Sequence, residues 1–316
     1  MNIVTGGCSF SETRHCVDYH RFDMMDDYDD MQPESGYKSW ALHLEDIVPN
    51  SKVYNTAMPG AGNGFISRAV IYKVNELLSK GEDVNHVCIQ LTACDREEIL
   101  VDVDDASSET DKNLLCHHIP TLDGGLENGI DWKKIKKDNN NKMWLKHSYG
   151  QDSLLKYYYK YYNNDEFSVV KTLEHILRLQ WYFKSNNIKY KMFCGWNIFS
   201  ILPKMPRYPT EVRHLWSMVE WDNFWFHKKL GGISEWSRDN LPFEERFITG
   251  DRVTDDGNAL DEHPSNVAHK KFAKEVKIAT YFALLLSLSE EFFINKINID
   301  PIRGIKVIAE SIGKFI

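Results

Sequence analysis

Apolar residues in this chain occur in two arrangements: short runs that contain few polar residues, and longer stretches in which they recur every three or four positions. The short runs predict buried strands over residues 2–5, 52–55, 87–91 and 188–194, and a short final strand at 247–248. The helical spacing predicts helices over residues 40–47, 65–78, 154–162, 169–184, 211–229 and 267–288. Strands that alternate with helices in this way predict an α/β domain with a mainly parallel sheet.

Two segments interrupt this alternation. Residues 99–150 are polar, with clusters of acidic residues, glycine and asparagine, and we interpret them as a surface insertion after the third strand that could act as a lid. Residues 290–316 carry partly periodic apolar positions, which predict a helical extension that packs on the domain or on another subunit. The α/β domain itself is therefore expected to span residues 1–289.

Composition and charge narrow the possible functions. The 316 residues are 42% apolar and 27% charged, as in most soluble globular proteins, and their net charge is −8. Nucleic acid requires a basic face, so this acidic balance and the lack of a basic stripe interleaved with aromatic residues argue against such a partner. No leader-like segment and no membrane-length apolar run is present, so we expect a cytoplasmic protein without membrane contact. No CxxC pair occurs, and Cys88 and Cys194 are expected to be free buried thiols.

The first candidate for chemistry is Ser9, which follows the first predicted strand in the sequence Gly6-Gly7-Cys8-Ser9. Glycine lets the backbone turn sharply. A serine on such a turn can direct its hydroxyl into the crevice at the carboxyl ends of a parallel sheet, which is a suitable place for a nucleophile. The structural alternative is that Ser9 only caps the N-terminus of a helix.

The second candidate is His263, in the sequence Asp261-Glu262-His263-Pro264 ahead of the helix predicted over residues 267–288. Proline suits the first turn of a helix. In a parallel sheet, a histidine at this point could lie beside a serine after the first strand. The alternative is a loop histidine without a partner. We interpret His269 as a solvated position on the helix.

Two other patterns could indicate a metal or a cofactor. Residues 13–35 are acidic and contain four potential metal ligands, His15, Cys16, Asp18 and His20. Their spacing matches no closed zinc pattern, so we interpret the segment as a solvated loop beside Ser9 and expect no metal. The glycines at 60–64 lack the Lys-Ser/Thr of a P-loop and the spacing of a dinucleotide fingerprint. We predict a tight turn there that exposes a backbone N–H, and no cofactor.

Four short blocks are placed after the first three predicted strands and before the last helix of the domain. They read Gly7-Cys8-Ser9, Asn55 through Gly60, Thr92-Ala93-Cys94-Asp95 and Asp261-Glu262-His263-Pro264. In order and spacing these blocks resemble those of the SGNH (GDSL-like) hydrolases. That family has a serine block after the first strand, a glycine block after the second, a GxND block after the third and a DxxH-type block near the end. The resemblance implies a three-layer α/β/α sandwich with a flavodoxin-like, mainly parallel sheet.

The resemblance also implies roles for individual residues. Ser9 would be the nucleophile and His263 the general base, and the backbone N–H groups of Ser9 and Gly60 would bind the oxyanion. Cys94 stands where the family has an asparagine as a further oxyanion donor, and a thiol is a weaker donor than an amide. Loss of one such donor costs on the order of 3 kcal/mol of transition-state stabilisation.

The acid that orients the histidine is a second departure from the family pattern. The family usually has the acid three residues before the histidine, and Leu260 stands there. Either Asp261, two residues before His263, orients the imidazole, or a backbone carbonyl does.

By resemblance, the substrate class is small carboxylic esters, with O-acetyl groups on glycans as the leading case. Arg96, Trp196 and Asn197 follow predicted strands and are candidate substrate contacts. Alternatives are an ion pair for Arg96 and ordinary loop packing for the other two. Two further classes stay open: a catalytically impaired binding module, and an assembly protein that forms a homo-oligomer through its C-terminal extension.

Overall fold

The computed structural model describes residues 1–11, 38–58, 60–96, 98–102, 118–119, 142–146, 164–200, 202, 210–247 and 263–276. In chain order its elements are β1 (Asn2–Gly6), α1 (Trp40–Ile47), β2 (Lys52–Asn55), α2 (Asn63–Ser79), β3 (His86–Leu91), β4 (Glu98–Asp102), β5 (His118–Ile119), β6 (Lys142–Lys146), α6 (Asp165–Ser185), β7 (Lys189–Cys194), α7 (Thr210–Met218), the 3-10 turn η7 (Trp221–Asn223), β8 (Phe224–Trp225), α8 (Ile233–Asn240), α9 (Phe243–Arg246) and a helix over 266–276.

The main sheet has five strands in the order β2-β1-β3-β7-β8, and every neighbouring pair is parallel. All five carboxyl ends therefore lie along one edge. The chain runs from β1 outward to β2 and then returns past β1 to β3, so the winding direction reverses between β1 and β3. In open α/β sheets this reversal opens a crevice at the carboxyl edge, where ligands commonly bind.

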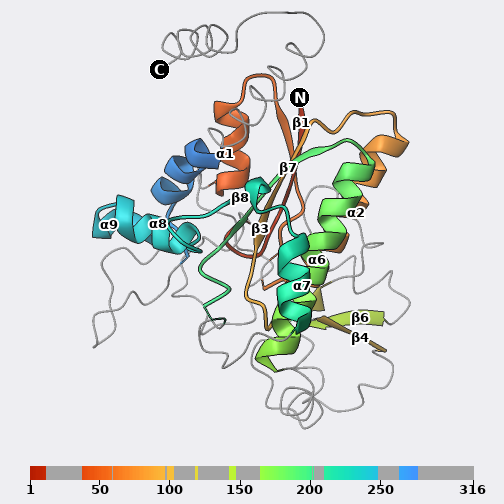
Figure 1. The fold of residues 1–316 in the computed structure, drawn as a ribbon. Coiled ribbons are helices and arrows are strands. Elements are labelled where there is room, and N and C mark those ends of the chain that lie inside the picture. Colours follow the sequence, from red (N-terminus) through yellow and green to blue (C-terminus); the bar gives the residue numbers. More distant parts are fainter. Residues whose placement is uncertain are drawn as a thin grey trace, which may run out of the picture. The chain divides into compact units, whose positions relative to one another are not determined.

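Helices cover both faces of the sheet, which is consistent with a three-layer α/β sandwich (Figure 1). Alternate residues of β3 point to opposite faces. Val87, Ile89 and Leu91 belong to the apolar core shared with α2 and α6. On β7, Phe193 faces the other way and packs against Trp40 of α1 at 4.8 Å between ring centroids and against Phe272 of the 266–276 helix at 5.2 Å.

Helix α6 begins where its sequence favours a helix start. The Asn164 side chain accepts a hydrogen bond from the Phe167 N–H at 2.9 Å, which caps the first turn. Asp165 and Glu166 place negative charge at the positive end of the helix dipole. The buried positions Leu173, Ile176 and Leu177 then repeat at helical spacing, so one side of the helix packs on the sheet.

The segment predicted as an insertion after the third strand contains a second, smaller sheet. It is antiparallel, with the order β4-β6-β5. Hairpin-type pairing of this kind needs no helical crossover, so the segment can form its own sheet without contributing a strand to the parallel one.

The four long predicted strands are confirmed, but two sequence predictions near the C-terminal half were wrong. The helix predicted over 211–229 ends at Met218, and Phe224–Trp225 pairs with β7 as the fifth parallel strand. The aromatic spacing of this segment fits a helix, but the rings of Trp221, Phe224 and Phe226 instead cluster against one another. Phe247, expected in a final strand, forms only an isolated antiparallel bridge to Pro264.

Other expectations concern thiols and segments beyond the described ranges. Cys88 and Cys194 are buried and free, as predicted. The helix predicted over 154–162 and the extension 290–316 lie outside the described residues, and they stay predictions. Within the part of the chain that the structure describes, no helix combines the length and apolarity needed to cross a membrane.

Candidate functional site

Ser9 lies in a tight turn directly after β1. The Ser11 N–H donates to the Cys8 carbonyl at 2.9 Å, which closes the turn. Glycine is required at position 7, because a Cβ there would lie only 2.2 Å from the Ser11 Oγ and 2.8 Å from the Gln90 Oε1. Only a residue without a side chain lets the turn fold back against β3 in this way.

The fully buried side chain of Gln90, on β3, holds this turn in place. Its Oε1 accepts hydrogen bonds from the Cys8 N–H at 3.0 Å and from the Ser11 hydroxyl at 3.0 Å. The Trp40 indole N–H in turn donates to the Ser11 Oγ at 2.8 Å. Because Ser9 lies between Cys8 and Ser11, this network fixes its backbone from both sides.

We expect Gln90→Met to destabilise the fold and to misplace Ser9. Methionine keeps the volume but removes the acceptor, which leaves the Cys8 N–H and the Ser11 hydroxyl without that partner. Two buried donors without an acceptor lower the free energy of unfolding by about 2–4 kcal/mol in total. Urea unfolding measures this loss. Gln180→Met is the matched control, since buried Gln180 bonds the Met218 carbonyl and the Glu220 N–H away from this turn. Equal losses of Ser9 reactivity in both folded variants would contradict the assignment.

The loop after β2 is tied to the Ser9 turn. The Met58 N–H donates to the Gly7 carbonyl at 3.1 Å, and the Asn55 Nδ2 donates to the Ser11 carbonyl at 2.7 Å. The Ala61 N–H donates to the Met58 carbonyl at 3.1 Å, and Gly60, inside this turn, has φ of +64°. A left-handed residue here favours glycine. The tight turn predicted from the glycine block is therefore present.

His263 reaches Ser9 across 254 residues of sequence. Its Nε2 lies 2.7 Å from the Ser9 Oγ, which is a good hydrogen-bond distance. The Phe10 ring packs on the imidazole at 4.8 Å between centroids and limits its position. Ser9 keeps 8% of its surface exposed, so its hydroxyl lies in a nearly covered site. The structure thus brings together the two candidates that stand at opposite ends of the domain's sequence.

No protein-family model, curated protein or solved structure matches this chain.

Two of the residues predicted as substrate contacts, Trp196 and Arg96, connect to this pair through the Phe10 ring. Trp196, which follows β7, packs edge-on against Phe10 with centroids 5.2 Å apart. The Arg96 guanidinium lies 5.3 Å from the centroid of the Trp196 ring, a cation–π distance. The Asn197 N–H donates to the Glu235 carboxylate at 3.2 Å, which fixes the start of the loop after β7.

Two predicted positions do not add to the described geometry around Ser9. Asp261 lies outside the described residues, so its role in orienting His263 stays a prediction. Cys94 donates its thiol hydrogen to the Ile198 carbonyl, with sulfur and oxygen 3.3 Å apart. Burial raises the pKa of this thiol to about 12, so it is protonated at neutral pH. Its role as an oxyanion donor also stays a prediction.

The interpretation of His269 as a solvated position was wrong, because the residue is 1% exposed. His269, Phe272, Ala273 and Val276 follow the i, i+3, i+4, i+7 spacing of one helix face, and that face is buried. Burial lowers the pKa of His269 to about 3, with smaller contributions from His43 and His263. The sequence does carry a signal for this burial, because His269 lies one helical turn before the apolar positions Phe272 and Ala273 on the same helix face.

Sequence reasoning missed Gln90 and Asn63, which organise the loops after β1 and β3. The Asn63 Oδ1 accepts from the Thr92 N–H at 2.9 Å, and its Nδ2 donates to the Thr92 carbonyl at 3.0 Å. This reciprocal pair joins the start of α2 to the end of β3.

Among the described residues, no three His, Cys, Asp or Glu side chains are grouped to hold a metal. The candidates at 15–20 lie outside those residues.

Proposed function

We propose that this protein is a serine ester hydrolase of the SGNH type, with Ser9 as the nucleophile and His263 as the general base. The observation that carries the proposal is the 2.7 Å approach of the His263 Nε2 to the Ser9 Oγ. It is supported by the position of Ser9 after the interior strand β1, at the reversal between β1 and β3. The β2-β1-β3-β7-β8 order is also the order of flavodoxin-like sheets.

The proposed reaction is acyl transfer to water through a covalent intermediate. With its proton on Nδ1, the neutral imidazole of His263 accepts the Ser9 hydroxyl hydrogen on Nε2 while the Ser9 oxygen attacks the ester carbonyl. The resulting imidazolium returns the proton to the leaving alcohol. Water then attacks the acyl-serine with His263 again as the base, which releases the carboxylic acid and restores Ser9.

The developing negative charge requires donors that are already in place. The proposed donors are the backbone N–H groups of Ser9 and Gly60, and neither donates among the hydrogen bonds described here. The Met58 N–H to Gly7 carbonyl bond joins the two loops that carry them. Donors held by a folded loop need little reorganisation during the reaction, which is the main source of such stabilisation.

The substrate we favour is a small ester, and an O-acetyl group on a carbohydrate is the leading case. Trp196 is half-buried and packs on Phe10, which contacts His263, and an aromatic ring at this position suits the apolar face of a sugar ring better than a long acyl chain. Arg96, stacked on Trp196, would supply hydrogen bonds to polar substituents.

A second candidate function is a binding module that has this site but little hydrolytic power. The observation that favours it is the engagement of the Cys94 thiol with the Ile198 carbonyl, at the position where the family has an oxyanion-binding asparagine. The two candidates differ in whether Ser9 attacks an acyl group at all.

Labelling with a serine-reactive phosphonate tests the proposal. We expect the full chain to gain the mass of one phosphonyl group, mapped by peptide mass spectrometry to the N-terminal peptide that holds Ser9. A general base hydrogen-bonded to the hydroxyl is what makes such a serine reactive. A folded protein that stays unlabelled over hours would refute the hydrolase proposal and favour the binding module.

A further inference from the structure

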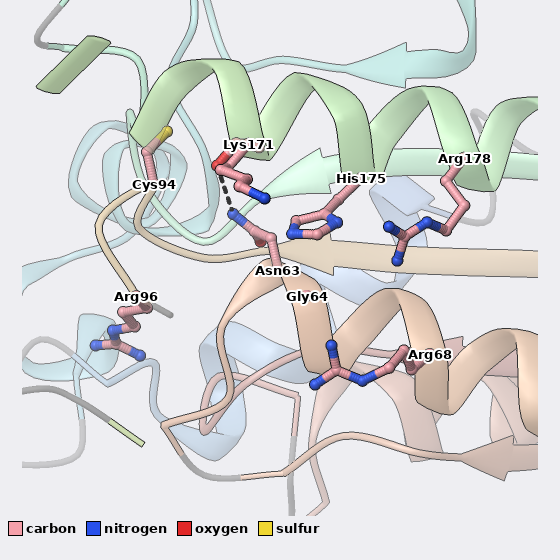
Figure 2. A pocket seen from close by; sticks show the side chains of 9 residues that line it. Asn63, Gly64, Arg68, Cys94, Arg96, Lys171, His175 and Arg178 are labelled. Carbon is pink, nitrogen blue, oxygen red and sulfur yellow. Dashed lines mark hydrogen bonds between the residues drawn. The ribbon is translucent and has the colours of Figure 1, made fainter. Parts of the chain in front are cut away.

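A cavity of about 220 Å³ lies between helices α2 and α6, next to the loop after β3. Figure 2 shows Lys171, His175 and Arg178 extending from α6, and Arg68 extending from α2, into the space between the two helices. Arg96 lines the same cavity from the loop after β3. We call this cavity the cationic pocket. Neither Ser9 nor His263 lines it.

The cationic pocket concentrates positive charge in a chain whose net charge is −8. Three arginines, Arg68, Arg96 and Arg178, and one lysine, Lys171, line it, and no aspartate or glutamate is among the described residues of its lining. Glu174, an exposed residue outside the lining, approaches the Lys171 Nζ at 4.0 Å. The described side chains that line the cationic pocket therefore carry four positive charges, and none of them is acidic. Like charges held together in this way repel one another unless an anion lies between them.

Several polar groups of the lining lack strong partners in the described structure. The Arg178 Nη1 contacts the Ser67 Oγ only at the long distance of 3.5 Å. The Arg96 Nη1 and the His175 Nδ1 are buried atoms with no hydrogen-bond partner among the described residues. Buried polar atoms of this kind usually have a partner. An anion in the cationic pocket would supply acceptor oxygens to these donors.

The first turn of α2 adds to the positive electrostatic potential in the cationic pocket. Asn63 and Gly64, at its start, line the cationic pocket, and no acidic residue occupies that turn. The positive end of this 17-residue helix therefore faces the cavity. Burial, together with the charges of Arg178, Arg68 and Lys171, lowers the pKa of His175 to about 3. The imidazole is thus neutral at pH 7 and can donate or accept a hydrogen bond.

We propose that the cationic pocket binds a phosphate-class oxyanion, a dianionic phosphate or sulfate group that is either free or carried on a larger molecule. Arginine guanidinium groups present paired donors that match the oxygens of such groups, and lysine adds a point charge. The carboxylate of a simple acid would satisfy fewer of these donors. The proposal does not require Ser9 to be a nucleophile.

Isothermal titration of the full chain with inorganic phosphate at constant ionic strength tests the proposal. We expect saturable binding that weakens as sodium chloride is raised. The double variant Arg68→Gln/Arg178→Gln is expected to bind at least about tenfold more weakly, because charge-assisted hydrogen bonds are lost. Arg213→Gln is the matched control, since Arg213 is an exposed arginine on α7 that does not line the cationic pocket. Near-UV circular dichroism checks that each variant is folded.

The outcomes separate the proposal from its alternatives. No binding by the wild-type chain at millimolar phosphate, or equal affinities in the double variant and the Arg213→Gln control, would overturn it. Titration with glucose 6-phosphate identifies the source: affinity at least about tenfold above that of phosphate indicates an anion carried on a larger molecule, and equal affinity indicates a free anion. Phosphate binding that persists while Ser9 resists labelling would refute the hydrolase proposal and leave the cationic pocket standing.

Discussion

Replacement of Ser9 by alanine is expected to lower the hydrolysis of an activated acetyl ester by about 10³-fold or more, because the attacking oxygen is lost. The change removes one hydroxyl whose proposed partner is the His263 Nε2 at 2.7 Å, and the turn keeps its anchors to Gln90. We therefore expect near-normal stability in urea unfolding. The rate is followed by release of 4-nitrophenol from 4-nitrophenyl acetate.

Ser217→Ala is the matched control for this experiment. Ser217 is exposed on α7, and its hydroxyl donates to the His214 carbonyl within the same helix. Its loss should leave the rate unchanged within about twofold, since exposed substitutions of this kind rarely act at a distance. If Ser9→Ala hydrolyses the ester as fast as the wild type, any activity resides elsewhere and the proposed nucleophile is wrong.

Replacement of His263 by alanine is expected to lower the same rate by about 10²–10⁴-fold, the usual contribution of a general base. The Ser9 hydroxyl would remain, but no group would accept its proton at 2.7 Å. Phosphonate labelling of Ser9 should slow in parallel, because both reactions need the activated oxygen. Addition of free imidazole should restore part of the rate by occupying the space left by the ring.

His214→Ala is the control for His263, since His214 is an exposed imidazole on α7. If the loss of any one histidine were enough to slow the reaction, the rate would fall equally in His263→Ala and His214→Ala. Full activity in folded His263→Ala would instead show that the contact with Ser9 is structural, and the binding-module alternative would then be preferred.

The parallel sheet and the Ser9–His263 pair could be predicted because their signals are local in sequence. A run such as 87–91 is buried on both faces and is apolar apart from Gln90, as expected of a central parallel strand. Ser9 follows a strand through two glycines, and His263 precedes a proline and a helix. Parallel topology then brings residues after strands and before helices to one edge.

The short strand β8 and the burial of His269 could not be predicted as readily. Two residues, Phe224 and Trp225, form β8, which is too short for a period of two to be visible. The tryptophans around them happen to match helical spacing. His269 was assigned by the usual preference of histidine for partly exposed positions, although the apolar face of its helix includes it.

The cationic pocket could not be predicted from the sequence, because its charged residues come from three separate segments. Arg68 lies on α2, Arg96 after β3, and Lys171 and Arg178 on α6. No short window of the sequence contains these four cations together, and the net charge of −8 gives no sign of them. Gln90 was missed for a related reason: a glutamine within an apolar run gives no sign that it will bond a turn 79 residues away.

Ser9 follows the interior strand β1, and its partner His263 comes just before the 266–276 helix, far along the chain. This separation in sequence has a consequence during synthesis. On the ribosome, Ser9 is synthesised 254 residues before His263, so its hydroxyl has no imidazole partner until position 263 has left the exit tunnel. The residues of the cationic pocket, all between 63 and 178, emerge much earlier. A nascent chain that has emerged past residue 178 would thus already carry the cations of that pocket, whereas the proposed Ser9–His263 pair could form only after residue 263 has emerged.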